Sequence, residues 1–409
     1  MKLKFSLICF IILSSIGPYI GYGLRLEHVF IYGTILFLPL ISNSPINKKL
    51  FLLLIPLLFS FSITFFFDLF TDSNARRGNL FSSIDNLIEP VLLIFISSLC
   101  LTRNFQETQF KKLLNLIKNI SLLAAFISIL TIFFDLKWML KYYISDIDSD
   151  LGLWNQVYSL GRYIGLFTQP IEAGIFFSMA LFVLVYMYKV RYIGKSSFYL
   201  SSIIILVGGM ISLSKNFYLI AIVCAILLYG QLSYWKPSRY ITLILISSLF
   251  IFIFIFSIDL TYTNYMNSLI EIYQRDGLTA ALTAGRFGGD NMTKVEIMFN
   301  EFWHKGFFTG FGISSSSVLD NGFLEYAYQG GIFSLIGYIF FIINGFVISY
   351  INRKDLTSKF LNIIFVYVLI ASVGGPVITS NRSNIIVLIL ICSLVVFKDN
   401  KLLKNEHSQ

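Results

Sequence analysis

The sequence predicts an all-α protein that crosses a membrane many times. Apolar residues make up 56% of the 409 residues and charged residues only 13%, whereas an ordinary soluble domain is about 25% charged. Apolar runs long enough to cross a hydrocarbon core of about 30 Å recur along the whole chain. This composition excludes a soluble enzyme and a disordered chain, because so few polar side chains could not cover a surface in water.

About twelve apolar runs are predicted to be membrane-spanning helices. They cover residues 5–23, 27–42, 49–68, 84–101, 113–134, 170–188, 198–213, 217–232, 240–259, 324–350, 359–379 and 383–397. The first run follows Lys2 and Lys4 and ends in Gly17-Pro18 rather than at a small-x-small cleavage site. We therefore interpret it as an uncleaved span and not as a signal peptide.

The spans divide the chain into three membrane regions joined by two long external loops. A five-span region covers 1–134, a four-span region 170–259 and a three-span region 324–397, and a cytoplasmic tail follows at 398–409. The two long loops cover residues 135–169 and 260–323. Long loops in compact proteins are commonly functional, so chemistry is expected on the external face.

The net charge of +9 is explained by membrane orientation. With the N-terminus in the cytoplasm, the cytoplasmic segments contain nineteen Lys and Arg residues and only four acids, and the rest of the chain is net acidic. This asymmetry is the positive-inside pattern, and it places both termini in the cytoplasm. The basic excess therefore does not predict binding to nucleic acid. The sequence has no Walker-type glycine loop and no metal-ligand cluster, so neither a cofactor nor a metal is predicted.

The larger loop carries the densest set of motifs. A helix is predicted over residues 291–303, with Asp290 as its N-cap and an apolar face along the membrane interface. Gly310-Phe311-Gly312 follows, and Asp320-Asn321-Gly322 precedes the next span.

Four isolated cations are predicted at the external ends of spans. They are Arg162, Lys215, Arg286 and Arg382. Cations beside helix N-termini are a typical arrangement for binding an anion. Each also has a structural interpretation: Arg162 and Arg286 could brace a loop, and Lys215 and Arg382 could anchor helix ends at lipid headgroups.

The order of these motifs resembles the O-antigen polymerase and O-antigen ligase superfamily. The resemblance covers roughly residues 155–385. It rests on Gly161-Arg162, the Ser214-Lys215-Asn216 turn, Gly285-Arg286, the helix containing Trp303, Gly310-Phe311-Gly312, Asp320-Asn321 and Gly330-Gly331. It implies a glycosyltransferase of the bacterial cytoplasmic membrane that uses an undecaprenyl-diphosphate-linked oligosaccharide on the external face, without metal or nucleotide sugar. A separate membrane protein that regulates chain length is an expected partner, besides the lipid bilayer itself.

Two departures from the superfamily pattern favour a polymerase over a ligase. The middle turn has Ser214-Lys215 where the superfamily usually has Ser-Arg, so the charge is kept but the bidentate fork is lost. The ligases have a histidine at the position of Asp320, with the same spacing to Gly331. We therefore predict a polymerase of O-antigen, capsule or a related exopolysaccharide. A ligase and a lipid-linked oligosaccharide flippase are the alternatives.

The reaction itself assigns roles to these residues. Negative charge grows on the departing diphosphate, which cations stabilise. Arg286 and Arg162 are predicted as the main diphosphate contacts, supported by Lys215 and Arg382. A direct displacement inverts the anomeric centre, and a base assists the acceptor hydroxyl. The candidate bases are Asp320, His304, Glu172 and Glu325. Two of them also have a structural interpretation: Asp320 could cap a helix, and His304 could be a polar residue at the membrane interface.

Two further features lie inside predicted spans. Glu89 is followed by Pro90 in the fourth span, and a charge at that depth defaults to a functional role; it is a secondary candidate. His28, near the external end of the second span, is interpreted as structural. Gly374-Gly375-Pro376 predicts a kink within the eleventh span.

Overall fold

The fold was analysed in a computed structural model of the chain. The structure describes residues 2–21, 24–41, 47–70, 80–101, 105–136, 138, 141–143, 157–233, 270–275, 300–313, 321–351, 355–380 and 382–407. Among these, helices dominate and the only sheet is one short strand pair. The predicted all-α class is therefore confirmed.

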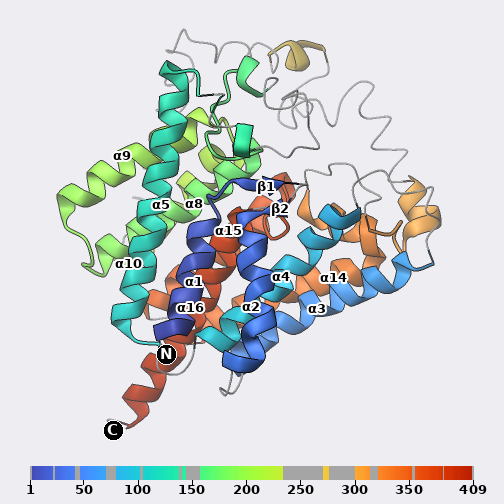
Figure 1. Ribbon diagram of the computed structural model, residues 1–409, viewed down its shortest axis with the longest axis horizontal. Helices are drawn as coiled ribbons and strands as arrows, with labels where there is room; N and C mark the ends of the chain where they lie inside the picture. Colours follow the sequence, from blue (N-terminus) through green and yellow to red (C-terminus); the bar gives the residue numbers. More distant parts are fainter. Residues whose placement is uncertain are drawn as a thin grey trace.

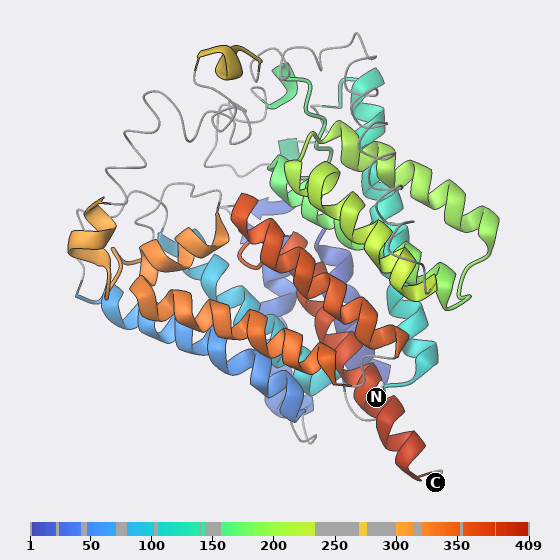
Figure 2. The ribbon, with the colours of Figure 1, turned by 180° about the vertical axis from the view of Figure 1, so that it is seen from behind.

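The described helices form one bundle of long, mostly antiparallel elements (Figures 1 and 2). The long helices are α1 (Lys2–Ser14), α2 (Leu26–Ile41), α3 (Lys48–Asp68), α4 (Leu80–Cys100), α5 (Glu107–Phe133), α8 (Pro170–Lys189), α9 (Lys195–Ile211), α10 (Ile222–Ser233), α14 (Gly322–Tyr350), α15 (Leu356–Gly374) and α16 (Ser383–His407). Short elements are the strands β1 (Tyr19–Gly21) and β2 (Leu24–Arg25) and the turns η2 (Lys141–Tyr143), η3 (Asn216–Ala221) and η4 (Phe302–Gly306).

Seven helices of the described chain are long and apolar enough to cross a membrane. They are Lys48–Asp68, Glu107–Phe133, Pro170–Lys189, Asn216–Ser233, Gly322–Tyr350, Leu356–Gly374 and Ser383–Lys401. Three shorter apolar helices lie at Leu3–Ser14, Leu26–Phe37 and Lys195–Ile211. The protein is thus a polytopic membrane protein. The total of about twelve spans remains a prediction, and the run at 240–259 lies outside the described residues.

Helices α8 and α16 form the centre of the bundle. In α8 and α16, 89% of the apolar membrane-spanning stretch is buried, whereas in α3 and α5 only 39% of it is buried. A helix that is apolar on all sides and packed on all sides belongs to a core, and one with a single packed face leaves the other for lipid. The N-terminus of α8 and the start of α16 are therefore enclosed by other helices.

Two predicted spans end earlier than expected. Helix α1 stops at Ser14, and Gly17-Pro18 leads into β1, which pairs antiparallel with β2. Pro18 supplies no backbone N–H, so a helix could not continue through it. Helix α15 likewise ends at Gly374. The predicted kink at Gly374-Gly375-Pro376 is a helix end, and the described residues that follow it, 375–380, are non-helical.

The two ends of the bundle differ in chemistry. Both chain termini lie at one end, here called the terminus end, and β1 and β2 lie at the opposite end, the strand end (Figures 1 and 2). Several cations predicted to share one side of the membrane lie together at the terminus end. There Lys49 pairs with Asp399, Lys401 pairs with Asp355, and Lys398 donates to the carbonyl of Ile348.

Helices α3 and α14 are in close contact through small residues. Ser60 Oγ donates to the carbonyl of Ser334 at 2.7 Å, and Thr64 Oγ1 lies 3.0 Å from Ser334 Oγ. A Cβ on Gly337 would lie 2.2 Å from Ser60 Oγ and 2.7 Å from the Pro56 carbonyl oxygen. Small residues let helix backbones approach within a membrane, where packing replaces the hydrophobic effect as the driving force.

Replacing Gly337 with leucine is expected to separate α3 from α14. The added side chain has no space against Ser60 and Pro56, and overpacking typically costs about 1–3 kcal/mol. The measurement is the thermal unfolding midpoint of the purified protein in detergent. Ile336→Leu is the matched control, because Ile336 is adjacent and exposed. Equal midpoints for the two variants would show that this contact does not hold the helices together.

Helix α14 is broken near its strand-end terminus by two glycines. Gly330 and Gly331 are non-helical, with φ of +70° at Gly331. The turn containing Gly310 and Gly312 is packed against the break. Phe311 N–H donates to the Tyr328 carbonyl, Gly312 N–H to the Gln329 carbonyl, and Ile332 N–H to the Phe307 carbonyl. The backbone groups that the break removes from the helix are therefore paired with this turn.

The structure describes only the last part of the predicted interfacial helix. Most of residues 291–303 lies outside the described chain, and only residues 300 and 301 followed by η4 are described as helical turns. Trp303 in this segment is exposed.

Candidate functional site

The structure brings several of the predicted site residues together at the strand end. Glu172 lies in the first turn of α8, and Arg162, Lys215 and Arg382 belong to three segments around that turn. His304 lies elsewhere, exposed in η4. Arg286 and Asp320 lie outside the described residues, so their roles remain predictions.

Direct contacts hold these three segments against one another. Tyr163 N–H donates to the Ile211 carbonyl at 2.9 Å, and Arg162 Nη2 donates to the Leu213 carbonyl at 3.1 Å. The loop before α8 is thereby fixed to the turn that contains Lys215. The same turn reaches α8 itself, because a Cβ on Gly174 would lie 2.0 Å from Ser214 Oγ. Only a glycine permits this approach.

Arg382 is the most enclosed of the predicted cations. Its side chain is fully buried, and its guanidinium donates to the carbonyls of Leu166 and Tyr143. The guanidinium carbon also lies 5.3 Å from the centre of the Tyr19 ring and 5.5 Å from that of Tyr143. Arg382 has φ of +54°, a backbone conformation that is uncommon outside glycine and that recurs at functional sites.

Two predicted carboxylates take part in hydrogen bonds in this region. Glu172 Oε2 accepts from the backbone N–H of Thr168 at 3.0 Å and from its hydroxyl at 2.8 Å. Glu325 Oε2 accepts from the Thr379 hydroxyl at 2.6 Å. Both acids therefore fix neighbouring loops, and Glu172 in addition is buried at the start of α8. A role for either as a base remains a prediction.

Several buried polar atoms at this end have no hydrogen-bond partner within the part of the chain that the structure describes. They are Ser214 Oγ, Asn216 Nδ2, Arg382 Nε and both side-chain polar atoms of Asn384. A buried unpaired polar group costs about 1–3 kcal/mol, so such atoms call for an explanation. Most of these groups carry N–H or O–H donors. Helices α8, α14 and α16 also begin at this end, and helix N-termini favour anions.

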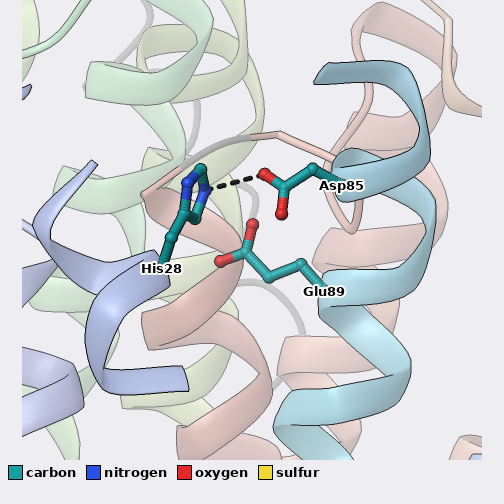
Figure 3. A group of neighbouring side chains, drawn as sticks. All are labelled: His28, Asp85 and Glu89. Carbon is teal, nitrogen blue, oxygen red and sulfur yellow. Dashed lines mark ion pairs between the residues drawn. The ribbon is translucent and has the colours of Figure 1, made fainter. Parts of the chain in front are cut away.

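A second charged group lies beside the first, and Glu89, the secondary candidate from the sequence, is one of its members. Arg25 in β2 is 2% exposed and is surrounded by acids from two helices. Its guanidinium nitrogens lie 3.1 Å from Glu27 Oε1, 3.3 Å from Asp85 Oδ2 and 3.4 Å from Glu89 Oε2. We call Arg25, Glu27, His28, Asp85 and Glu89 the Arg25 cluster. Figure 3 shows three of its members, with Glu89 one helical turn below Asp85.

His28 joins Asp85 within the cluster. Its Nε2 lies 2.7 Å from Asp85 Oδ2 (Figure 3). On the other side of that carboxylate, the Tyr32 hydroxyl donates to Asp85 Oδ1. The carboxylate is thus held at both oxygens, and a hydrogen-bonded chain runs from Tyr32, which is 37% exposed, to His28, which is 6% exposed.

His28, Asp85 and Glu89 have the donor types of a metal site, but their surroundings favour a guanidinium. Arg25 Nη2 lies 2.6 Å from His28 Nε2, where a metal ion would have to bind. The opposite ring nitrogen, Nδ1, faces the backbone N–H of Arg25 at 3.4 Å. A metal-bound histidine donates its second nitrogen instead. The geometry therefore does not fit a metal centre.

The electrostatics of the cluster centre on Arg25. Burial disfavours its charged form, but Glu27 and Glu89 outweigh burial and hold the pKa of Arg25 above its ordinary value. The guanidinium is therefore permanently charged. Three carboxylates against one guanidinium leave an excess of negative charge, which is expensive in a buried site unless protons or cations balance it.

Tyr19 connects the two charged groups. It is paired with Arg25 across the strand pair, and Arg382 lies over its ring. Burial raises the pKa of Tyr19, and both Arg25 and Arg382 oppose that rise. The Arg382 region and the Arg25 cluster are therefore neighbouring parts of one polar centre at the strand end.

The Arg25 cluster had one usable signal in the sequence. Glu89 drew attention because a charge inside an apolar run is costly. Its partners were not recognisable, because Arg25 lies 64 residues from Glu89 and His28 was interpreted as structural. His28 contacts both Asp85 and Arg25, and its structural interpretation stays a prediction.

Taken together, the fold and this centre define a polytopic helical membrane protein with buried ionisable groups at one end of its bundle. No protein-family model matches the chain, and no characterised protein matches its sequence.

Proposed function

We propose that the protein is a polysaccharide polymerase that transfers glycan from an undecaprenyl-diphosphate carrier onto a second lipid-linked repeat unit. The observation that supports this most is the set of buried donors around Arg382, Ser214, Asn216 and Asn384 that have no partner among the described residues. Such donors suit the oxygens of a diphosphate, to which arginine forks and amide N–H groups bind well.

The chemistry required of this centre is stabilisation of a leaving group. The acceptor hydroxyl attacks the anomeric carbon while the bond to the lipid diphosphate breaks. Preorganised cations at the departing oxygens lower the barrier, because negative charge grows there in the transition state. Arg382 and Arg162 are held by backbone carbonyls from other segments, so both are oriented before the substrate binds. Arg286 and Lys215 complete the proposed diphosphate contacts.

The membrane setting of the proposal follows the sidedness of the charges. The strand end is proposed to face the outside of the bacterial cytoplasmic membrane. The terminus end, which is rich in cations, is proposed to face the cytoplasm. The repeat unit then reaches the centre from the external leaflet. A chain-length regulator in the same membrane is a proposed partner, and the product is O-antigen, capsule or a related exopolysaccharide.

Replacing Arg382 with lysine is expected to reduce chain extension by on the order of 10²-fold, because the charge remains but the planar fork is lost. The purified protein is incubated with a lipid-diphosphate-linked repeat unit, and the products are sized. Lys359→Arg is the control, since Lys359 lies at the terminus end, where its ammonium donates to the Gln231 carbonyl.

The same assay separates the proposed activity from its alternatives. The wild-type protein should convert single repeat units to a ladder of lengths. Transfer of finished glycan to a different acceptor, without a ladder, would indicate a ligase. Movement of the intact lipid-linked unit across a vesicle membrane, without any new glycosidic bond, would indicate a flippase.

A further inference from the structure

The Arg25 cluster has no part in the diphosphate chemistry proposed above, yet it contains a carboxylate held at both of its oxygens by ionisable neighbours. His28 Nε2 and Asp85 Oδ2 are 2.7 Å apart, and the Tyr32 hydroxyl bonds the other oxygen of Asp85. A base that is oriented by two neighbours is the usual arrangement of a general base in an enzyme.

The charge of the cluster favours uptake of a proton. Arg25 faces Glu27 from α2 and both Asp85 and Glu89 from α4, so the buried group is net negative when His28 is neutral. Glu89 Oε1 and Glu27 Oε2 accept no hydrogen bond from the residues that the structure describes, and Glu27 Oε1 is in an ion pair with Arg25. Both side chains are nearly fully buried. A proton added to the cluster brings it closer to neutrality, which a buried site favours.

The neighbouring elements do not cancel this charge. Across the strand pair, Tyr19 faces Arg25, and beyond it lie Arg382, which precedes α16, and Glu172 of α8. That outer pair contributes one charge of each sign. The excess of negative charge therefore stays with the acids of α2 and α4.

Access to the cluster is through Asp85. This carboxylate is 13% exposed, whereas Glu89 is 1% and Glu27 is 0% exposed. Tyr32 extends the hydrogen-bonded chain to the surface of the bundle. Figure 3 shows Asp85 above Glu89 on α4, one turn nearer the start of that helix.

We infer that Asp85, joined to His28 and Tyr32, is the proton acceptor for the acceptor-sugar hydroxyl in the proposed transfer. The inference rests on the proposed function and adds the base that the sequence left open. In the step, the hydroxyl oxygen forms a bond to the anomeric carbon, and the carbon–oxygen bond to the diphosphate breaks. The diphosphate leaves with the electron pair, and the hydroxyl proton moves to the Asp85–His28 pair.

This assignment places the two halves of the reaction on the two parts of the centre. The leaving group is bound at Arg382, and the attacking group is deprotonated at Asp85. Tyr19 and Arg25, which pair across β1 and β2, lie between them. The strand pair thereby sets the spacing of donor and acceptor.

The test is a steady-state extension assay with a purified lipid-diphosphate-linked repeat unit across a range of pH. Asp85→Asn should lower the maximal rate by on the order of 10²-fold or more, with little change in the substrate concentration at half-maximal rate. The wild-type rate should fall as the pH is lowered, because protons occupy the acceptor. Tyr32→Phe should shift that pH profile. Glu107→Gln, a carboxylate that accepts from Tyr192, is the matched control.

Folding is checked separately by size-exclusion chromatography and the unfolding midpoint of each variant. If Asp85→Asn does not fold, Tyr32→Phe carries the test, since it removes one hydroxyl and leaves the ion pairs intact. Suppose that the wild type extends chains and that Asp85→Asn, or a folded Tyr32→Phe, has the same rate and pH profile. That result would overturn the inference and leave the proposed function standing. Failure of the wild type to extend chains would instead overturn the proposed function. Loss of activity with a chelator, restored by Mn²⁺ only when Asp85 is present, would make the cluster a metal site and also overturn the inference.

Discussion

Arg25→Met should destabilise the protein by about 3–5 kcal/mol, the typical cost of leaving buried charges without their partner. Methionine matches the length of the arginine stem but leaves Glu27, Asp85 and Glu89 without their shared cation. The expected result is a large fall in the unfolding midpoint in detergent and a lower yield of folded protein.

The control for this variant is Lys401→Met at the terminus end. Lys401 also pairs with an acid, Asp355, but its side chain is 53% exposed. A solvent-exposed pair contributes about 0–1 kcal/mol, so this variant should unfold close to the wild-type midpoint. The double variant Arg25→Met/Glu89→Gln should have a higher unfolding midpoint than Arg25→Met. That result would show that uncompensated charge causes the loss of stability. If both single variants lose the same small amount of stability, the Arg25 cluster is not a stabilising centre.

Gly331→Ala should displace the glycine-rich turn from helix α14. An added Cβ would lie 2.2 Å from the carbonyl oxygen of Phe308, and the position has φ of +70°. The backbone conformation alone costs a non-glycine residue about 1–3 kcal/mol, and the clash adds to that cost. Faster proteolysis within residues 306–313 and a lower unfolding midpoint are the expected results.

Gly33→Ala is the matched control for this variant. Gly33 lies inside helix α2, and a Cβ there would meet no atom within 4 Å. Alanine in a helix interior is favoured over glycine by about 0.5–1 kcal/mol, so this control should be neutral or slightly stabilising. Wild-type resistance to proteolysis in Gly331→Ala would show that the turn does not depend on the broken helix.

The fold class was predictable because the hydropathy of each segment, by itself, determines whether that segment forms a helix in the membrane. Every described apolar run contains a helix, since a chain in lipid must pair its backbone groups within the segment. The helix ends were less predictable. The early ends of α1 and α15 both lie just before Gly-Pro sequences, which an apolar count treats as part of a span.

The grouping of the predicted cations was also recoverable in part. Arg162, Lys215 and Arg382 each adjoin a span, and short connections place span ends on the same side of a bundle. The pattern could not show that Arg382 is fully buried or that Tyr19 lies beneath it. Those contacts arise from packing between segments more than 200 residues apart along the chain, for which a single sequence offers no local signal.

The position of Arg382 also has a consequence for how the protein is made. Its hydrogen bonds reach back 216 residues to Leu166 and 239 residues to Tyr143. A ribosome delivers α16 after every other described helix, and early segments begin to fold before late ones emerge. The polar centre is therefore assembled only once the last helix has entered the membrane. A chain cut short before Arg382 would therefore contain the earlier helices and the Arg25 cluster, but it would lack the guanidinium that joins Leu166 to Tyr143.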